Sequence, residues 1–307
     1  MLRSQLCSAE SLRSPELRAW AERLRPMWAT DLEDRRDVML HRKMWEWLFI
    51  AEALRERDML APGRSGLGFG VGQEPLVALF AAAGCDLVAT DQPQEQAVAS
   101  GWTDSQVEWA GGVESLPTFG FCSDEDLARR VRFRPVDMNA IPEDLRGFDF
   151  TWSSCALEHL GTLTAGMDFV VAQMQCLRPG GVAVHTTEYL VAGRDETVEA
   201  GGTVFYRRRD IDDLVRRLRS AGDAIEVDYT EGTTPDDLHV DVAPYTDVHL
   251  RTQLGGFVTT SLALVVTKGT GRRRARGWRA ERGWRRRQSS RRPSAPAGGD
   301  ADGQPSG

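Results

Sequence analysis

Short apolar runs alternate with helical patterns between residues 64 and 192, and this alternation constrains the fold more than any other feature of the chain. The strand-like runs are GLGFG, CDLVATD, VRFRPVD, FDFTWSS and GVAVHTT. Helical stretches such as EPLVALFAAAG and AGMDFVVAQMQCL separate them. Strands that alternate with helices are joined by right-handed crossovers and form a parallel sheet covered on both faces. The sequence therefore predicts an α/β fold.

The chain divides into three predicted parts. Residues 1–62 are expected to form an N-terminal helical extension, because apolar residues recur at three- and four-residue steps from Leu40 to Leu54 before Pro62 ends the pattern. Residues 63–270 are expected to form the α/β domain, which ends in a helix at DIDDLVRRLRSAG and an apolar strand at VTTSLALVVTK. Residues 271–307 are predicted to be a basic disordered tail, because they contain too little apolar surface to offset the entropy of folding.

Composition limits the function classes that fit this chain. Its 307 residues are 41% hydrophobic, which is enough for a large buried core. Nothing resembles a signal peptide or a membrane-spanning run, so we expect a soluble, cytoplasmic protein with no membrane partner. Five scattered cysteines favour reduced thiols over disulfides or a zinc site. The net charge is −7 although the tail contains eleven arginines, so residues 1–270 are acidic and unsuited to binding nucleic acid.

A glycine-rich turn, GLGFGVGQEP at residues 66–75, follows the first predicted strand and precedes a helix. Parallel α/β sheets bind ligands at such turns. Because glycine has no Cβ atom, Gly70 and Gly72 would let a ligand approach the main chain closely. The dinucleotide fingerprint G-x-G-x-x-G fails in every register, because its third glycine falls on Val71, Gln73 or Pro75. A nicotinamide dehydrogenase is therefore a distant alternative.

The pattern resembles the class I S-adenosylmethionine-dependent methyltransferases, in particular their small-molecule, methyltransferase type 11-like subgroup. The family's first motif is similar to D-x-G-x-G-x-G, and its second strand ends in an acidic residue, as LVATD ends in Asp91 here. The segments VDMNAIPEDLRGFDF, FDFTWSSCALEHL and CLRPGGVAVHTT are similar to later motifs of the family. The resemblance implies a Rossmann-like sheet of seven strands, with the last antiparallel, and S-adenosyl-L-methionine as cofactor.

The resemblance also implies roles for individual residues. Asp91 would accept hydrogen bonds from both ribose hydroxyls, whereas Asp137 and Met138 would contact the adenine. The chain departs from the family at two positions: Gly68 stands where an acidic residue is usual, and Glu74 replaces a glycine. We predict that Glu74 supplies the missing carboxylate. The predicted cofactor-binding residues are Gly68, Gly70, Gly72, Glu74, Asp91, Gln92, Asp137, Met138, Ser153 and Ser154.

Candidate catalytic residues follow the fourth and fifth predicted strands. Methyl transfer from a sulfonium mainly requires positioning, and a general base is needed only when the acceptor must lose a proton. His159, His185 and Glu188 are the candidates, although each of these side chains could also be an ordinary polar group at a strand end. His239, Asp241 and His249 follow in HVDVAPYTDVHL, where hydrogen bonding to substrate is favoured over a metal site, and we predict no metal.

Aromatic residues offer two interpretations. Trp20, Trp28, Trp45 and Trp47 would either form a lid over the site or pack helices onto the sheet. The segment GWTDSQVEW (Trp102, Gln106) would either form the edge of a pocket or pack against the core.

The Pro-Pro-aromatic turn of enzymes that methylate DNA bases is absent, so a small polar acceptor, methylated on oxygen or nitrogen, is expected. The alternative is an inactive cofactor-binding protein with a regulatory or scaffolding role. The sequence indicates no oligomeric state.

Overall fold

The structure is a computed structural model, and it describes residues 1–27, 40–104, 109–192, 196–245 and 248–270. Met1–Thr270 form one compact unit. The predicted disordered tail, Trp28 and Gln106 lie outside the described residues. None of the described helices is long and apolar enough to cross a membrane.

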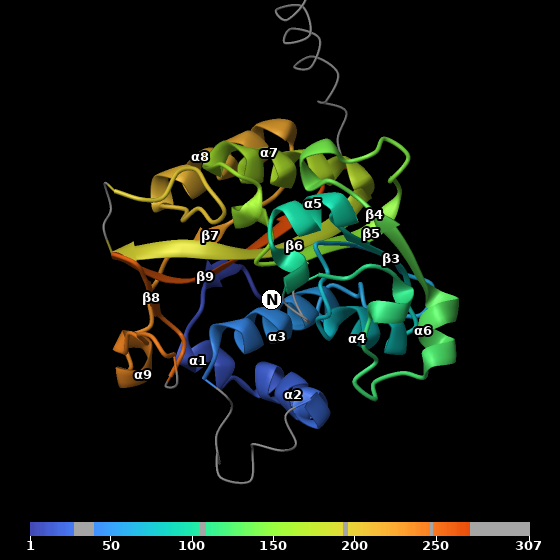
Figure 1. Ribbon diagram of the computed structural model, residues 1–307, viewed down its shortest axis with the longest axis horizontal. Helices are drawn as coiled ribbons and strands as arrows, with labels where there is room; N and C mark the ends of the chain where they lie inside the picture. The colour runs from blue at the N-terminus through green and yellow to red at the C-terminus, as the bar shows by residue number, and fades with distance from the viewer. Residues whose placement is uncertain (28–39, 105–108, 193–195, 246–247, 271–307) are drawn as a thin grey trace, which may run out of the picture. The chain divides into compact units, whose positions relative to one another are not determined.

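One sheet runs through this unit (Figure 1). Its order is β4-β3-β2-β5-β6-β9-β1-β7, and β8 pairs with β9. The strands from β4 to β6 are mutually parallel, whereas β9 is antiparallel to β6. The predicted Rossmann-like α/β fold is confirmed. The strands are β1 (Ser4–Leu6), β2 (Ser65–Phe69), β3 (Asp86–Asp91), β4 (Val131–Pro135), β5 (Phe148–Ser154), β6 (Leu177–Ala192), β7 (Val227–Asp228), β8 (Thr252–Leu254) and β9 (Phe257–Thr267).

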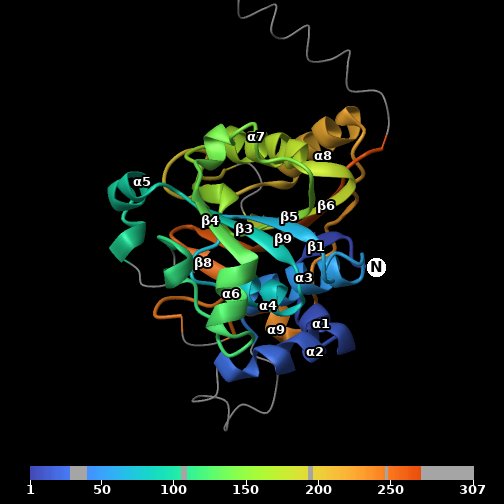
Figure 2. The ribbon, with the colours of Figure 1, turned by 90° about the vertical axis from the view of Figure 1, so that its right-hand side faces the viewer.

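Helices cover both faces of the sheet, with α7 and α8 on one side and α3, α4 and α6 on the other (Figures 1 and 2). Two buried apolar clusters lie between the layers. One includes Phe80 and Trp152, and the other includes Phe169 and Leu264. The helices are α1 (Ala9–Leu12), α2 (Pro15–Leu24), α3 (Arg42–Arg55), α4 (Leu76–Ala82), α5 (Gln94–Ala99), α6 (Asp124–Arg130), α7 (Leu163–Gln173), α8 (Arg208–Ala221) and α9 (Pro235–Leu238).

Short 3₁₀ helices connect several of these elements. Two of them, η4 and η5, follow strands β4 and β5 and so lie near the carboxyl ends of the parallel strands. The 3₁₀ helices are η1 (Arg25–Met27), η2 (Trp102–Asp104), η3 (Val113–Ser115), η4 (Met138–Ala140), η5 (Leu157–His159) and η6 (Met174–Cys176).

The N-terminal segment differs from the prediction. Residues 1–62 are predicted to be a helical extension, and α1, α2 and α3 are helices, but β1 pairs antiparallel with β9 and parallel with β7, inside the sheet. Ser4 is fully buried, and its Oγ accepts a hydrogen bond from Val265 N at 2.9 Å. Asp237 Oδ1 accepts one from Ala9 N at 2.6 Å. Residues on both sides of position 62 therefore belong to the same compact unit.

The described strands number nine rather than the predicted seven. The two additional strands, β1 and β8, are three residues long. Segments this short contain too few alternating positions to give a strand pattern in a sequence. The antiparallel strand predicted at the end of the sheet is present as β9, although β1 lies beside it.

Candidate active site

The glycine turn joins β2 to α4, between the carboxyl ends of β3 and β5. Gly70 and Gly72 have φ angles of 56° and 49°, a left-handed conformation that favours glycine. A Cβ atom on Gly70 would lie 2.9 Å from Cβ of Ala156. Because β3 and β5 flank β2 on opposite sides, the chain order reverses here, and open α/β sheets bind ligands at such points.

Asp91 ends β3 and is 6% exposed. Its Oδ2 accepts hydrogen bonds from Gly72 N at 3.0 Å and Ala110 N at 3.2 Å, and its Oδ1 accepts one from Gln92 N at 2.8 Å. Burial raises the pKa of Asp91 to about 6, although these three N–H donors oppose the shift. The carboxylate therefore connects the glycine turn to the loop beyond β3.

Met138 and Asp137 lie beside this turn. Met138 is buried, and its Sδ would lie 3.6 Å from a Cβ atom on Gly70. Asp137 is half-buried and accepts a hydrogen bond from Asn139 N at 2.8 Å through Oδ1. Gln92 follows Asp91, and its carbonyl oxygen accepts a hydrogen bond from Trp109 Nε1 at 3.0 Å. The residues predicted to surround a nucleoside are thus neighbours of the turn, while their cofactor roles remain predictions.

Core packing explains why residue 68 is a glycine. It lies inside β2, and a Cβ atom on it would be 2.4 Å from Cζ2 of Trp152 and 2.6 Å from Cγ1 of Val71. The indole ring of Trp152 occupies the space beside Gly68, so no acidic side chain fits at this position. The glycine is explained by the core, and a cofactor contact is not required to account for it.

A charged cluster missed by the sequence analysis lies at the N-terminal end of α3. Lys43 Nζ is 2.6 Å from Glu74 Oε1 and 3.6 Å from Glu46 Oε2. It also donates hydrogen bonds to Ser154, at 3.1 Å to Oγ and 3.3 Å to the carbonyl oxygen. Burial alone would lower the pKa of Lys43, but the carboxylates of Glu74 and Glu46 outweigh burial and raise it. Glu74 and Ser154, both predicted site residues, therefore meet at Lys43.

Glu46 is the buried centre of this cluster. It is fully buried and accepts hydrogen bonds from Ser154 Oγ at 3.2 Å, Cys155 Sγ at 3.1 Å and Ser261 Oγ. Burial would raise the pKa of Glu46, but the charges of Lys43 and Arg42 outweigh it and lower the pKa. The helix thus places a carboxylate with a lowered pKa beside the end of β5 and the middle of β6.

Glu188 lies on β6 beyond the end of β5 and pairs with Arg42. Burial raises the pKa of Glu188, Arg42 opposes the shift, and the nearby charge of Glu158 adds to it. The hydroxyl of Thr259 hydrogen-bonds the Glu188 carboxylate and opposes the shift as well. Within the described residues, Oε1 of Glu158 is buried without a hydrogen-bond partner. Glu158 therefore contains an acceptor atom that a donor on a ligand would satisfy.

His185 does not lie in this cluster. It is fully buried on the α7 side of the sheet, packs edge-on against Phe169, and contacts Ser153 Oγ through Nδ1 at 2.8 Å. Burial lowers the pKa of His185 to about 3, so the ring is neutral. The prediction that His185 acts as a base is not supported, because strand alternation turns its side chain and that of Ser153 into the core rather than toward Lys43.

His159 lies at the surface of the same edge of the sheet. Its ring packs edge-on against Trp102 with centroids 4.6 Å apart, and its Nδ1 is 2.8 Å from the carbonyl oxygen of Gly202. Trp102 follows β3, whereas His159 follows β5. The two rings connect the loops on either side of the glycine turn, as a pocket edge would.

The polar segment that contains Asp241 and His249 contacts the N-terminal end of α3. His249 Nδ1 is 2.6 Å from Asp241 Oδ2, and its ring stacks on that of His41, with centroids 4.5 Å apart. Arg42 N donates to the carbonyl oxygen of His249 at 2.8 Å. His239 lies instead at the end of α9. No group of three metal-ligating side chains occurs among the described residues.

The described N-terminal tryptophans pack. Trp45 is fully buried, and Trp20 donates from Nε1 to Glu52 Oε2 at 2.9 Å. Trp47 is 8% exposed and lies 6.0 Å from Lys43 Nζ, beside the charged cluster. For these three rings, the structure fits the interpretation that they pack helices onto the sheet better than the interpretation that they form a lid over the site.

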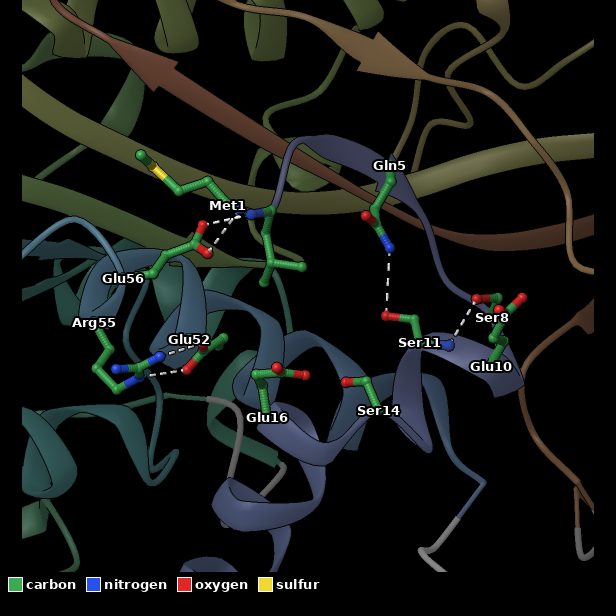
Figure 3. A pocket seen from close by; sticks show the side chains of 11 residues that line it. Met1, Gln5, Ser8, Glu10, Ser11, Ser14, Glu16, Glu52, Arg55 and Glu56 are labelled. Atoms are coloured by element: carbon green, nitrogen blue, oxygen red, sulfur yellow. Dashed lines mark hydrogen bonds and ion pairs between the residues drawn. The ribbon is translucent and has the colours of Figure 1, made fainter.

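A separate depression lies between the N-terminal strand and α3 (Figure 3). Its walls include Met1, Gln5 and Glu56, and it also contains the ion pair of Arg55 with Glu52. It is remote in the fold from the glycine turn, because Arg55 ends α3 whereas Arg42 and Lys43 begin it.

No protein-family model matches the chain, and no curated protein sequence matches it. Its fold is similar to that of an S-adenosylmethionine-dependent methyltransferase from Clostridium acetobutylicum, with 14% identity, a TM-score of 0.40 and coverage of 82% of this chain and 98% of that chain. It is also similar to the DhpI–SAH complex, with 16% identity, a TM-score of 0.41 and coverage of 86% of this chain and 100% of that chain. A third similar structure is the cyclase SpnF, with 16% identity, a TM-score of 0.45 and coverage of 73% of this chain and 81% of that chain. Similarity this low does not support a function. The proposed function below is therefore based on the residues of the site.

Proposed function

We propose that this protein binds S-adenosylmethionine at the glycine turn and transfers its methyl group to an oxygen or nitrogen atom of a small polar acceptor. The observation that supports the proposal most is the contact between the left-handed turn at Gly70 and Gly72 and the buried carboxylate of Asp91. A main chain without Cβ atoms beside a strand-end acid suits a nucleoside.

The residues around the turn fit the nucleoside with one adjustment. A carboxylate offers about four lone-pair positions, and the main chain uses three of those of Asp91. One remains on Oδ1, so one ribose hydroxyl fits without rearrangement. The expectation that Asp91 accepts from both hydroxyls requires one of the N–H groups, such as that of Ala110, to give way.

The sulfonium of the cofactor supplies an activated methyl group, so the protein has to position the acceptor and exclude water. Glu188 is the candidate for holding the acceptor, because its side chain lies on β6 beyond the end of β5 and its raised pKa suits exchange of a proton. His159 would border the cofactor at the pocket edge. His185 takes no part in the proposal.

Calorimetry with S-adenosylhomocysteine tests cofactor binding. The wild type should bind it, and Asp91→Ala should lose affinity about ten- to a hundredfold, since a charge-assisted hydrogen bond contributes about 1.5–3 kcal/mol. Mass spectrometry of metabolite extracts incubated with S-adenosylmethionine should then show products heavier by one methyl group. No binding by the wild type would overturn the proposal.

The alternative function is cofactor binding without catalysis. It is favoured by the tight packing of Gly68 against Trp152 and by the ion pair between Lys43 and Glu74 beside the turn. Binding in the calorimeter without methylated product, across a broad set of acceptors, would support this alternative.

A further inference from the structure

The side-chain ammonium of Lys43 is bound by residues that follow or end two neighbouring strands, β2 and β5. Its Nζ contacts Glu74 Oε1 at 2.6 Å, from the turn after β2, and the carbonyl oxygen and Oγ of Ser154 at 3.3 and 3.1 Å, from the end of β5. Three acceptors from two neighbouring strands thus converge on one cation. This point lies beside the glycine turn, since β2 and β5 are adjacent.

The ion pair has an outer and an inner carboxylate. The side chains of Lys43 and Glu74 are 31% and 15% exposed, whereas Glu46, 3.6 Å behind Lys43, is fully buried. If Glu74 turned toward another cation, Lys43 would still be neutralised by Glu46. Glu74 can therefore exchange its partner without leaving the half-buried charge of Lys43 uncompensated, because Glu46 still balances it.

An α-amino-acid group carries a positive and a negative charge on adjacent atoms, which match this pair. Its ammonium can bind Glu74 and the Ser154 carbonyl, while its carboxylate binds Lys43. One ion pair between side chains is then replaced by two between protein and ligand. Such charge-assisted hydrogen bonds are about twice as strong as neutral ones.

We propose that Lys43 and Glu74 form a clamp for the zwitterionic amino-acid end of a ligand whose nucleoside lies on the glycine turn. This inference rests on the proposed function, because it takes the ligand to be S-adenosylmethionine or a compound of the same class. Lys43 and Glu74 are then binding residues that determine preference for a ligand with a free amino-acid group.

The test compares S-adenosylhomocysteine with 5′-methylthioadenosine, which has the nucleoside but no amino-acid end. Calorimetry should show that the wild type binds the first more tightly. Lys43→Met and Glu74→Gln should each weaken S-adenosylhomocysteine about ten- to a hundredfold and leave methylthioadenosine within about twofold. Arg55→Met is the matched control, because it removes a cation from the far end of α3 and should change neither affinity.

The outcomes separate the two proposals. If the wild type binds neither ligand, the proposed function fails. If Lys43→Met and Glu74→Gln weaken both ligands alike, or neither, the site exists but the clamp is wrong. Tighter binding of S-adenosylhomocysteine by Lys43→Met would also overturn the clamp, because Lys43 would then be an internal competitor for the ammonium site. Thermal unfolding of each variant identifies any that fail to fold, and Lys43→Arg, which keeps the charge, should retain most of the affinity in a folded protein.

Discussion

At the scale of single residues, the shifted pKa of Asp91 gives a pH dependence with a definite sign. Its folded-state pKa is about 6, and burial is the main cause. An ionised carboxylate accepts a ribose hydroxyl, and protonation removes acceptor capacity. Affinity for S-adenosylhomocysteine should therefore fall as the pH drops below 6, by about tenfold at pH 5, where about ten molecules in eleven carry the proton.

Loss of the fold does not explain this decrease, because the same shift acts in the opposite direction on stability. A folded pKa above the unfolded value means that the folded state binds the proton more tightly, so this group stabilises the ligand-free protein as the pH falls from 6 toward 4. Calorimetry at pH 7, 6 and 5, with circular dichroism at each pH, measures both effects. Asp91→Asn should bind weakly with little change over this range, and an unchanged wild-type affinity at pH 5 would contradict the assignment.

Gly68 gives a second prediction at this scale. A Cβ atom there would lie 2.4 Å from the ring of Trp152, which is itself buried in the sheet. Gly68→Ala should therefore lower the free energy of unfolding by about 1–3 kcal/mol, the usual cost of an overpacked core. Gly256→Ala is the control, because a Cβ atom added there would have no neighbour within 4 Å and the φ of Gly256 is not positive. Urea denaturation compares the two, and equal stability would mean that Trp152 shifts freely.

At the scale of elements, the sequence predicted the parts whose pattern is local. β2, β3 and β5 are apolar runs that end at a turn or an acid, so these strands and the edge of the site could be inferred. β6 was predicted from the run GVAVHTT, but it extends from Leu177 to Ala192 and so includes His185 and Glu188.

The charged turn of α3 could not be inferred, because Arg42, Lys43 and Glu46 are spaced as on a solvated helix face. Only tertiary packing places them beside the end of β5 and the middle of β6. It also brings Lys43, from α3, next to Glu74, from the turn after β2.

Strand β1 decides between two views of the N-terminal segment. As part of a lid it would be dispensable for folding, but it pairs with both β9 and β7. Deleting residues 1–7 would leave an open gap in the sheet and remove the buried Ser4 and Leu6. We expect a loss of several kcal/mol of stability and no cooperative thermal transition near that of the full chain. A truncated protein with unchanged melting that only lost activity would favour the lid.

At the scale of the whole molecule, Met1–Thr270 contain the sheet, both apolar clusters and every residue assigned to the site. A unit that contains its own core does not need the remaining chain in order to fold. Deleting residues 271–307 should leave the melting temperature and the affinity for S-adenosylhomocysteine unchanged. Since the deletion removes eleven arginines, the truncated protein should bind an anion-exchange column more tightly than the full chain. A fall in melting temperature of several degrees would show instead that the tail stabilises the fold, and weaker binding alone would place the tail at the site.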